Sequence, residues 1–120
     1  MKVITFAFTL CLFVTAAVAQ KTPISIKIPN FTDPAVKAFY TKYSNHLIKC
    51  IYAIREKNEA RTIALFKDPG EQLVAREKVL AKEVVKIPSE KQKYLEFAKQ
   101  VYPYLKEVEQ SAYYQKMYGK

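Results

Sequence analysis

The chain has 120 residues, of which 50% are hydrophobic and 26% are charged, so it can form one globular domain with a modest core. Its formal net charge of +9 favours acidic surfaces as partners. With two cysteines, one histidine and two glycines in the sequence, a framework of several disulfides, a zinc site of repeated cysteines and histidines, and a glycine-rich phosphate loop are all excluded.

Residues 1–19 are predicted to be a signal peptide. Lys2 precedes an apolar run over residues 3–14, and an A-x-A cleavage pattern follows at residues 17–19. A membrane anchor is disfavoured because the run is shorter than the roughly 20 residues of a spanning helix. A lipoprotein is disfavoured because Cys11 lies inside the run. We therefore expect an exported chain that is secreted, or periplasmic if bacterial, with its formal net charge lowered from +9 to +8 by the loss of Lys2.

The remaining charge suggests three kinds of partner, namely an acidic protein, a polysaccharide or an anionic lipid surface. Nucleic acid is disfavoured because lysine heavily outnumbers arginine, whereas proteins that read bases and phosphates favour the arginine fork. We expect no transmembrane segment in the mature chain, and either a monomer or a weak homodimer.

Residues 20–32 are expected to form an extended arm. The isoleucines of segment 24–28 alternate with polar residues, which is the period of an extended strand. The arm can lie along the helices and bury these isoleucines. Alternatively it can be an exposed edge that pairs with another chain, although Pro23 and Pro29 would limit such pairing.

Asn30 begins an Asn-Phe-Thr sequence at the end of this arm. This is the acceptor pattern for N-linked glycans in a eukaryotic secretory pathway. In a bacterial export pathway the same three residues would carry no such meaning.

The first helix is predicted over residues 33–58. Asp33 can accept hydrogen bonds from the free N–H groups of the first turn, and Pro34 occupies a position where a missing N–H costs nothing. Apolar side chains then recur three and four residues apart on a face that other helices must cover: Val36, Tyr40, Tyr43, Leu47, Cys50 and Ile54, widened by Phe39 and Ile51.

Cys50 lies within this apolar face, and we interpret it as a buried, inert thiol. The alternative is a disulfide to a second chain, because the removal of Cys11 would leave Cys50 without a partner in its own chain. A structural oligomer joined through Cys50 is therefore one hypothesis for the protein's role.

Ile48 and Tyr52 project from the opposite face of the first helix, four residues apart. Single apolar side chains on a surface are common. A pair on one ridge is nevertheless a candidate contact point for a partner.

A turn or a helix restart is predicted at residues 68–70, where the sequence is Asp-Pro-Gly, with a short helix before it. The second long helix follows, and its apolar face consists of Leu73, Leu80, Val84 and Ile87.

Lys78, Lys82 and Lys86 form a row at spacing four beside this face. Neighbouring like charges on a helix cost roughly a few tenths of a kcal/mol each, so we interpret the row as a solvated face. The alternative is a strip that attracts an anionic partner, and these three lysines are our candidates for that attraction.

The last helix is predicted to begin at Ser89, which with Gln92 matches a capping box. Its apolar face consists of Tyr94, Ala98, Val101, Leu105, Val108 and Ala112. Pro103 removes one backbone hydrogen bond and clashes with the preceding turn, so we expect a kink near Tyr102 or a break into two helices. Tyr94 and Tyr102 are expected to pack in the core.

These elements predict an all-α fold. We expect a three-helix up-down-up bundle over residues 33–120, with its last helix kinked or broken at Pro103 and the extended arm of residues 20–32 before it. A break at Pro103 would make it a bundle of four helices.

Enzymatic activity is not expected. His46 has no cysteine or serine motif to partner it, and the sequence lacks a C-x-x-C motif, a second histidine and a D-x-D run. Glu56 and Glu59 lie among basic residues, as in surface ion pairs. We therefore expect no metal and no cofactor.

The sequence Asp-Pro-Ala-Val at residues 33–36, followed by Phe39, Tyr40 and Tyr43, resembles the opening of small exported helical domains of unknown function. A charged turn such as residues 56–59 follows the long helix in those domains. The resemblance implies a helical hairpin or a three-helix bundle and carries no activity. The small, basic, helical character and the ending at residues 116–120 are also loosely similar to gastropod sperm lysins.

Our leading expectation is a secreted, non-catalytic interaction module whose basic surface meets an acidic partner. In that hypothesis Lys78, Lys82 and Lys86 supply electrostatic attraction, and Ile48 with Tyr52 supplies an apolar contact. A second hypothesis is a carrier of lipid or another hydrophobic ligand, or a membrane-active protein of the lysin kind.

Overall fold

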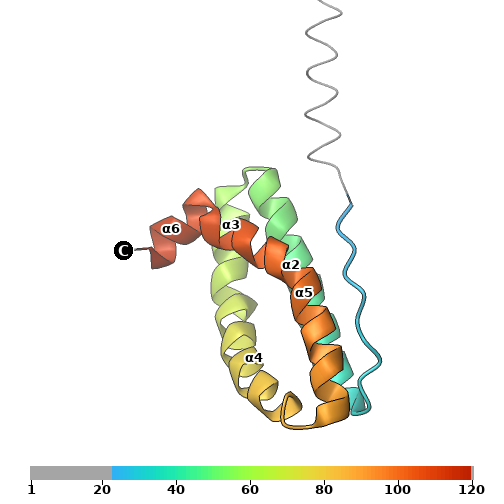
Figure 1. The fold of residues 1–120 in the computed structure, drawn as a ribbon. Helices are drawn as coiled ribbons and strands as arrows, with labels where there is room; N and C mark the ends of the chain where they lie inside the picture. Colours follow the sequence, from blue (N-terminus) through green and yellow to red (C-terminus); the bar gives the residue numbers. More distant parts are fainter. Residues whose placement is uncertain (1–22, 120) are drawn as a thin grey trace, which may run out of the picture.

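The computed structural model describes residues 23–119, and the predicted signal peptide lies outside this range. Every regular element in the described range is helical (Figure 1). The elements in chain order are α2 (Pro34–Arg55), α3 (Glu59–Leu65), the irregular turn η1 (Phe66–Gly70), α4 (Glu71–Val84), α5 (Pro88–Gln110) and α6 (Ala112–Tyr118).

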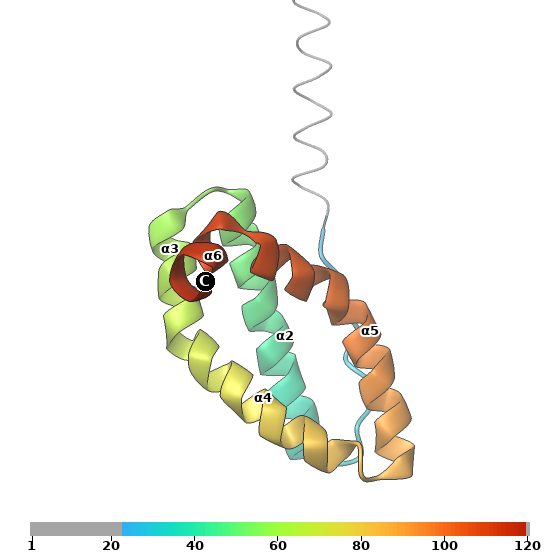
Figure 2. The ribbon, with the colours of Figure 1, turned by 60° about the vertical axis from the view of Figure 1, so that its left-hand side comes forward.

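The expected three-helix bundle is replaced by a fold with an additional helix. α2 and α5 run in one direction, and the kinked run α3–η1–α4, which lies to one side of them, runs in the other (Figure 1). If that kinked run is counted as one helical segment, residues 23–119 contain four helical segments, the fourth being α6. α6 follows α5 and lies across the end of the bundle near α3 (Figure 2).

α2 begins as its sequence predicts, since the Asp33 carboxylate accepts a hydrogen bond from the N–H of Ala35 at 2.8 Å. It ends at Arg55, three residues before the predicted end. Lys57 has φ of 59°, which turns the chain out of the helix. Asn58 then caps α3 by accepting a hydrogen bond from the N–H of Arg61 at 3.1 Å.

The core is built around Tyr40 and Phe97, whose ring centroids lie 4.9 Å apart between α2 and α5. The predicted inward face of α2 is confirmed at Tyr40, Leu47, Cys50 and Ile51, all of which are buried. Phe97 was absent from the predicted face of the last helix, although only 2% of it is exposed. The core therefore extends further around α5 than the spacing of its aliphatic residues indicates.

The half-buried carboxylate of Glu77 joins three helices at the edge of this core. The hydroxyl of Tyr40 donates a hydrogen bond to the Glu77 carboxylate at 3.0 Å, and the hydroxyl of Tyr94 lies 3.4 Å from the same oxygen. Burial, followed by the charge of Glu77, raises the pKa of both tyrosines above the usual value. Both hydroxyls therefore remain protonated donors in the folded protein at neutral pH.

The extended arm lies along the helices, as the first of its two interpretations predicts. Its isoleucines at 24, 26 and 28 are half-buried against the core. The side-chain amide of Gln100 accepts a hydrogen bond from the N–H of Lys27 at 2.8 Å and donates one to its carbonyl at 2.9 Å. Lys27 thus obtains from α5 the two backbone hydrogen bonds that a neighbouring strand would give it.

The predicted start of the last helix is wrong, and of the two alternatives predicted at Pro103, a kink or a break, the break does not occur there. α5 starts at Pro88 with Ile87 as its cap, so Ser89 lies inside the helix and its hydroxyl donates to Glu90 at 3.3 Å, in place of the predicted capping box. α5 also continues through Pro103 to Gln110. Figure 1 shows it bending toward α3 over this part, and the helix breaks later, where the Ser111 side chain caps α6.

Two predicted core residues lie at the surface instead. Tyr102 is 59% exposed, on a part of α5 that the other helices do not cover. Ile87 is 52% exposed, since α4 ends at Val84 and the chain leaves the helical face before reaching it.

Candidate functional site

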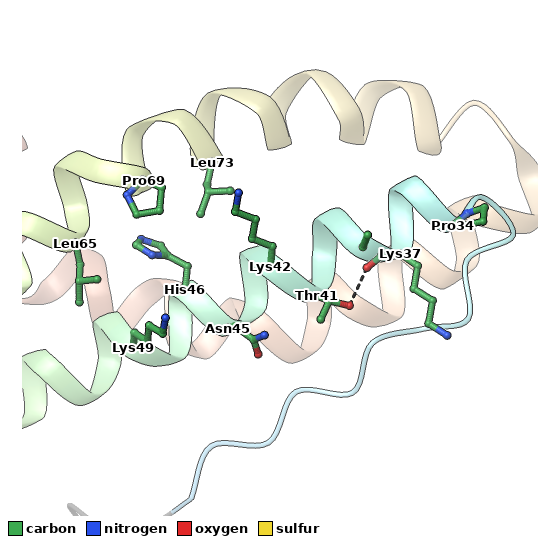
Figure 3. A pocket seen from close by; sticks show the side chains of 11 residues that line it. Pro34, Lys37, Thr41, Lys42, Asn45, His46, Lys49, Leu65, Pro69 and Leu73 are labelled. Carbon is green, nitrogen blue, oxygen red and sulfur yellow. Dashed lines mark hydrogen bonds between the residues drawn. The ribbon is translucent and has the colours of Figure 1, made fainter.

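A surface cleft of about 690 Å³ lies between α2 and the segment formed by the end of α3, η1 and the start of α4 (Figure 3). We call it the lysine cleft. It is lined by Pro34, Lys37, Ala38, Thr41, Lys42, Asn45, His46 and Lys49 of α2 and by Leu65, Pro69 and Leu73 opposite.

The α2 wall of the cleft follows from helical spacing. Ala38, Lys42, Asn45 and Lys49 are separated by four, three and four residues, so their side chains lie on one face of the helix. The opposite wall depends on the kink, because Leu65 ends α3 and Leu73 lies in α4. Pro69 lies between them in η1 and brings an apolar surface toward the middle of α2 (Figure 3).

The cleft is electropositive. It is lined by three lysines, and none of its lining residues is acidic. Lys37 donates a hydrogen bond to the side-chain oxygen of Asn30 at 3.3 Å, and Lys42 and Lys49 make no salt bridge with any residue in the described range. The ammonium groups therefore add their fields without neutralisation by a neighbouring carboxylate.

His46 forms the inner end of the lysine cleft. Burial, together with the nearby charge of Lys49, lowers its pKa below the usual value, and a hydrogen bond from the imidazole to the backbone of Leu65 only partly opposes this. Its Nε2 lies 3.4 Å from the Sγ of Cys50. The imidazole is therefore neutral at pH 7.

Gly70 allows the chain to pass close to this histidine. A Cβ atom at this position would lie 2.6 Å from the carbonyl oxygen of Leu65 and 3.3 Å from Nε2 of His46. Any larger side chain would force the η1 segment away from α2.

A second, apolar pocket of about 360 Å³ lies on the inner side of His46, and we call it the apolar pocket. His46 and Leu73 line both sites and separate them. The other residues around the apolar pocket are Tyr43, Leu47, Cys50, Phe66, Gly70, Glu71, Val74, Ala75, Lys78, Leu105, Val108, Tyr114 and Tyr118.

Cys50 lies against His46, but the pair lacks the electrostatics of a catalytic dyad. The thiol is 4% exposed, and burial raises its pKa to about 11. A nucleophilic cysteine requires the opposite shift, toward a stable thiolate. In this conformation the thiol is also too buried to meet a second chain, so an intermolecular disulfide would require local opening of the fold.

The predicted lysine row lies on α4, away from the lysine cleft. Lys78, Lys82 and Lys86 are all exposed. Lys86 forms a 3.5 Å ion pair with Glu83, in which both side chains are largely solvated, and Lys78 lines the apolar pocket. Such an exposed pair contributes little, and a role for the row in binding remains a prediction.

The predicted apolar contact of Ile48 and Tyr52 has a neighbour within the chain. Both side chains are half-buried, and the hydroxyl of Tyr52 accepts a hydrogen bond from the N–H of Ile24 at 3.4 Å. The arm thus occupies part of this ridge. Asn30, the candidate glycan acceptor, is exposed, and its backbone carbonyl accepts a hydrogen bond from Lys93 at 2.9 Å.

None of the three lysines of the cleft was predicted from the sequence as a site residue, and Lys42 and Lys49 show why. Their spacing of seven on one helix face was a visible signal, but exposed lysines separated by polar residues are also the ordinary pattern of a solvated surface. Only the apolar wall of Leu65, Pro69 and Leu73 distinguishes this face from the row on α4.

Residues 23–119 contain neither a cluster of metal ligands nor a helix suited to cross a membrane. No group of three or more histidine, cysteine, aspartate or glutamate side chains there could hold a metal ion. No helix in that range has the length and hydropathy needed to cross a bilayer.

No protein family model matches the chain, and neither a curated protein nor a solved structure is significantly similar to it. The resemblances to small exported helical domains and to sperm lysins therefore depend on sequence patterns alone. The fold and the site define an all-helical protein with a lysine-lined surface cleft beside a separate apolar pocket.

Proposed function

We propose that the exported chain is a non-catalytic binding protein whose lysine cleft holds an acidic segment of a partner protein. The observation that carries this proposal is the composition of the cleft, in which Lys37, Lys42 and Lys49 line one concave surface without a single carboxylate. A concave site that is both cationic and partly apolar fits a peptide better than it fits a flat lipid surface.

The dimensions of the cleft support a short extended peptide. The α2 wall runs from Pro34 to Lys49, which spans about 22 Å at the helical rise of about 1.5 Å per residue. An extended peptide advances by about 3.3 Å per residue, so about seven residues cover this length. Acidic side chains would meet the lysines, and one apolar side chain would contact Leu65 and Leu73.

Because the lysines are solvent-exposed, the attraction should be screened by salt. The Debye length falls to about 8 Å at physiological ionic strength, so binding should weaken steadily as salt is added. Exposed ion pairs are individually weak. The three lysines are therefore expected to act together, with the apolar wall supplying part of the affinity.

The test is fluorescence polarisation with a fluorescein-labelled heptapeptide of six glutamates and one central leucine. The variant Lys42→Gln/Lys49→Gln should bind at least about tenfold more weakly than the unchanged chain, which corresponds to about 1.4 kcal/mol. The matched control is Lys91→Gln/Lys99→Gln on α5, which removes the same charge from exposed positions that line neither pocket.

Equal weakening in both double variants would mean that net charge alone drives association, and it would reject the cleft. The triple variant of Lys78, Lys82 and Lys86 to glutamine addresses the predicted row on α4 in the same assay. If that variant loses binding while Lys42→Gln/Lys49→Gln binds normally, the binding site is the lysine row on α4 and not the cleft.

A further inference from the structure

The apolar pocket exposes hydrophobic surface that the fold itself does not cover. Val74 of α4 is 48% exposed and Tyr118 of α6 is 41% exposed, although both line this pocket. Leu105 and Val108 of α5 line it and are only half-buried. Apolar side chains from three helices therefore surround one space that water or a ligand must occupy.

α6 forms the cover of this pocket, and its attachments are peripheral. None of its described residues is buried. It is held by the Tyr118 hydroxyl, which donates to Glu71 at 2.8 Å, by the exposed ion pair of Lys116 with Glu59 at 3.0 Å, and by the edge-to-face contact of Tyr114 with Phe66. Exposed polar contacts are individually weak, so the contact of Tyr114 with the buried ring of Phe66 is the main apolar attachment of this wall of the pocket.

One cationic side chain of the pocket lining, Lys78, is available to pair with an anionic head group. Lys78 is the single lysine among the lining residues, it is exposed, and it makes no salt bridge within residues 23–119. The one lining carboxylate, Glu71, already accepts a hydrogen bond from Tyr118. Deeper in the pocket His46 and Cys50 are neutral, so the interior suits a hydrocarbon chain.

The volume of the apolar pocket limits the length of the hydrocarbon chain that it can hold. A cavity of about 360 Å³ holds about twelve non-hydrogen atoms if each takes roughly 30 Å³, the share of one water molecule in the liquid. A carboxylic acid with ten carbons has that number of atoms.

We propose that the apolar pocket binds a medium-chain carboxylic acid of about ten carbons, with its chain against Leu47, Leu105 and Val108 and its carboxylate at Lys78. This site goes beyond the binding of an acidic peptide. Its charged residues differ from those of the lysine cleft, so each of the two proposals can be disproved without disproving the other.

The test is isothermal titration calorimetry of the chain with decanoate and, separately, with decanol, both below their aggregation concentrations. Saturable binding of decanoate at about one molecule per chain is expected. Val74→Asp should weaken it at least about tenfold, because a carboxylate would enter an apolar site and repel the ligand. Val79→Asp is the matched control, since Val79 lies on the same helix, is 65% exposed and does not line the pocket.

A second pair of variants tests the head group. Lys78→Gln should weaken decanoate binding and leave decanol binding unchanged, whereas Lys82→Gln should alter neither. Absence of saturable binding by both ligands would overturn the proposal, as would equal effects of Val74→Asp and Val79→Asp. Loss of decanoate binding in Lys42→Gln/Lys49→Gln, with Val74→Asp unaffected, would also overturn it by placing the ligand in the lysine cleft.

Discussion

The side-chain amide of Gln100 pairs with both backbone polar groups of Lys27. The Lys27 N to Gln100 Oε1 distance is 2.8 Å, and the Gln100 Nε2 to Lys27 carbonyl oxygen distance is 2.9 Å. These residues are 73 positions apart in the sequence. One amide on α5 therefore fixes the middle of an arm that has no regular structure of its own.

Gln100→Ala should release the arm while leaving the helices folded. The loss of two partly exposed hydrogen bonds should cost about 1 kcal/mol of stability. Hydrogen exchange followed by mass spectrometry should show faster exchange in residues 23–32 and unchanged exchange in α2. Gln92→Ala, at an exposed position of the same helix, is the control. An arm that remains protected in Gln100→Ala would show that the isoleucines and the hydrogen bonds at the two ends of the arm hold it without Gln100.

Phe97→Ala should be strongly destabilising. The ring is 2% exposed and lies 4.9 Å from that of Tyr40, so its removal leaves a cavity among aromatic side chains. Substitutions of this kind cost about 3 to 5 kcal/mol. Urea unfolding followed by circular dichroism measures the loss, and Leu95→Ala, two residues away and 47% exposed, should lower the free energy of unfolding far less.

The Cys50 thiol should react slowly in the folded protein. Burial raises its pKa to about 11, so the reactive thiolate is scarce at pH 8 and is also shielded from reagents. Alkylation by iodoacetamide should therefore be slow in buffer and rapid in urea. Non-reducing electrophoresis should show a monomer, and a dimer band that disappears on reduction would support the Cys50-linked oligomer.

The tyrosine cluster should make the fold sensitive to alkaline pH. Burial, with the charge of Glu77, raises the pKa of Tyr40 and Tyr43 in the folded state above the ordinary value of 10.0. Below pH 10 both states keep these protons, so stability is unaffected. Above pH 10 the unfolded state releases protons that the folded state retains, and the free energy of unfolding falls as pH rises.

Urea unfolding at pH 8, 9, 10 and 11 would measure this dependence. Tyr40→Phe removes one of the ionisable groups, so its stability should decline less steeply between pH 10 and 11, although it should be lower at pH 8 because the hydrogen bond to Glu77 is lost. An equally steep decline in Tyr40→Phe would assign the alkaline sensitivity to other groups.

Much of the local structure could be predicted because it depends on neighbouring residues. The start of α2 depends on Asp33 and Pro34, which act within a single turn. The buried face of α2 follows from the spacing of its apolar residues. The wrong predictions at Ser89 and Ile87 arise where helix ends move a residue off the expected face, and Tyr102 lies on a part of α5 that the other helices do not cover.

The sequence by itself determined an all-helical chain with a basic surface and a buried Cys50 on the inner face of α2, because helical periodicity and capping act over a few residues. Only the tertiary structure decided which lysines share a cleft and which surfaces the arm covers. Lys42 and Lys49 acquire an apolar wall because η1 brings Leu65, Pro69 and Leu73 opposite α2. Tyr52 meets Ile24, from a distant part of the chain, through packing that no local pattern encodes.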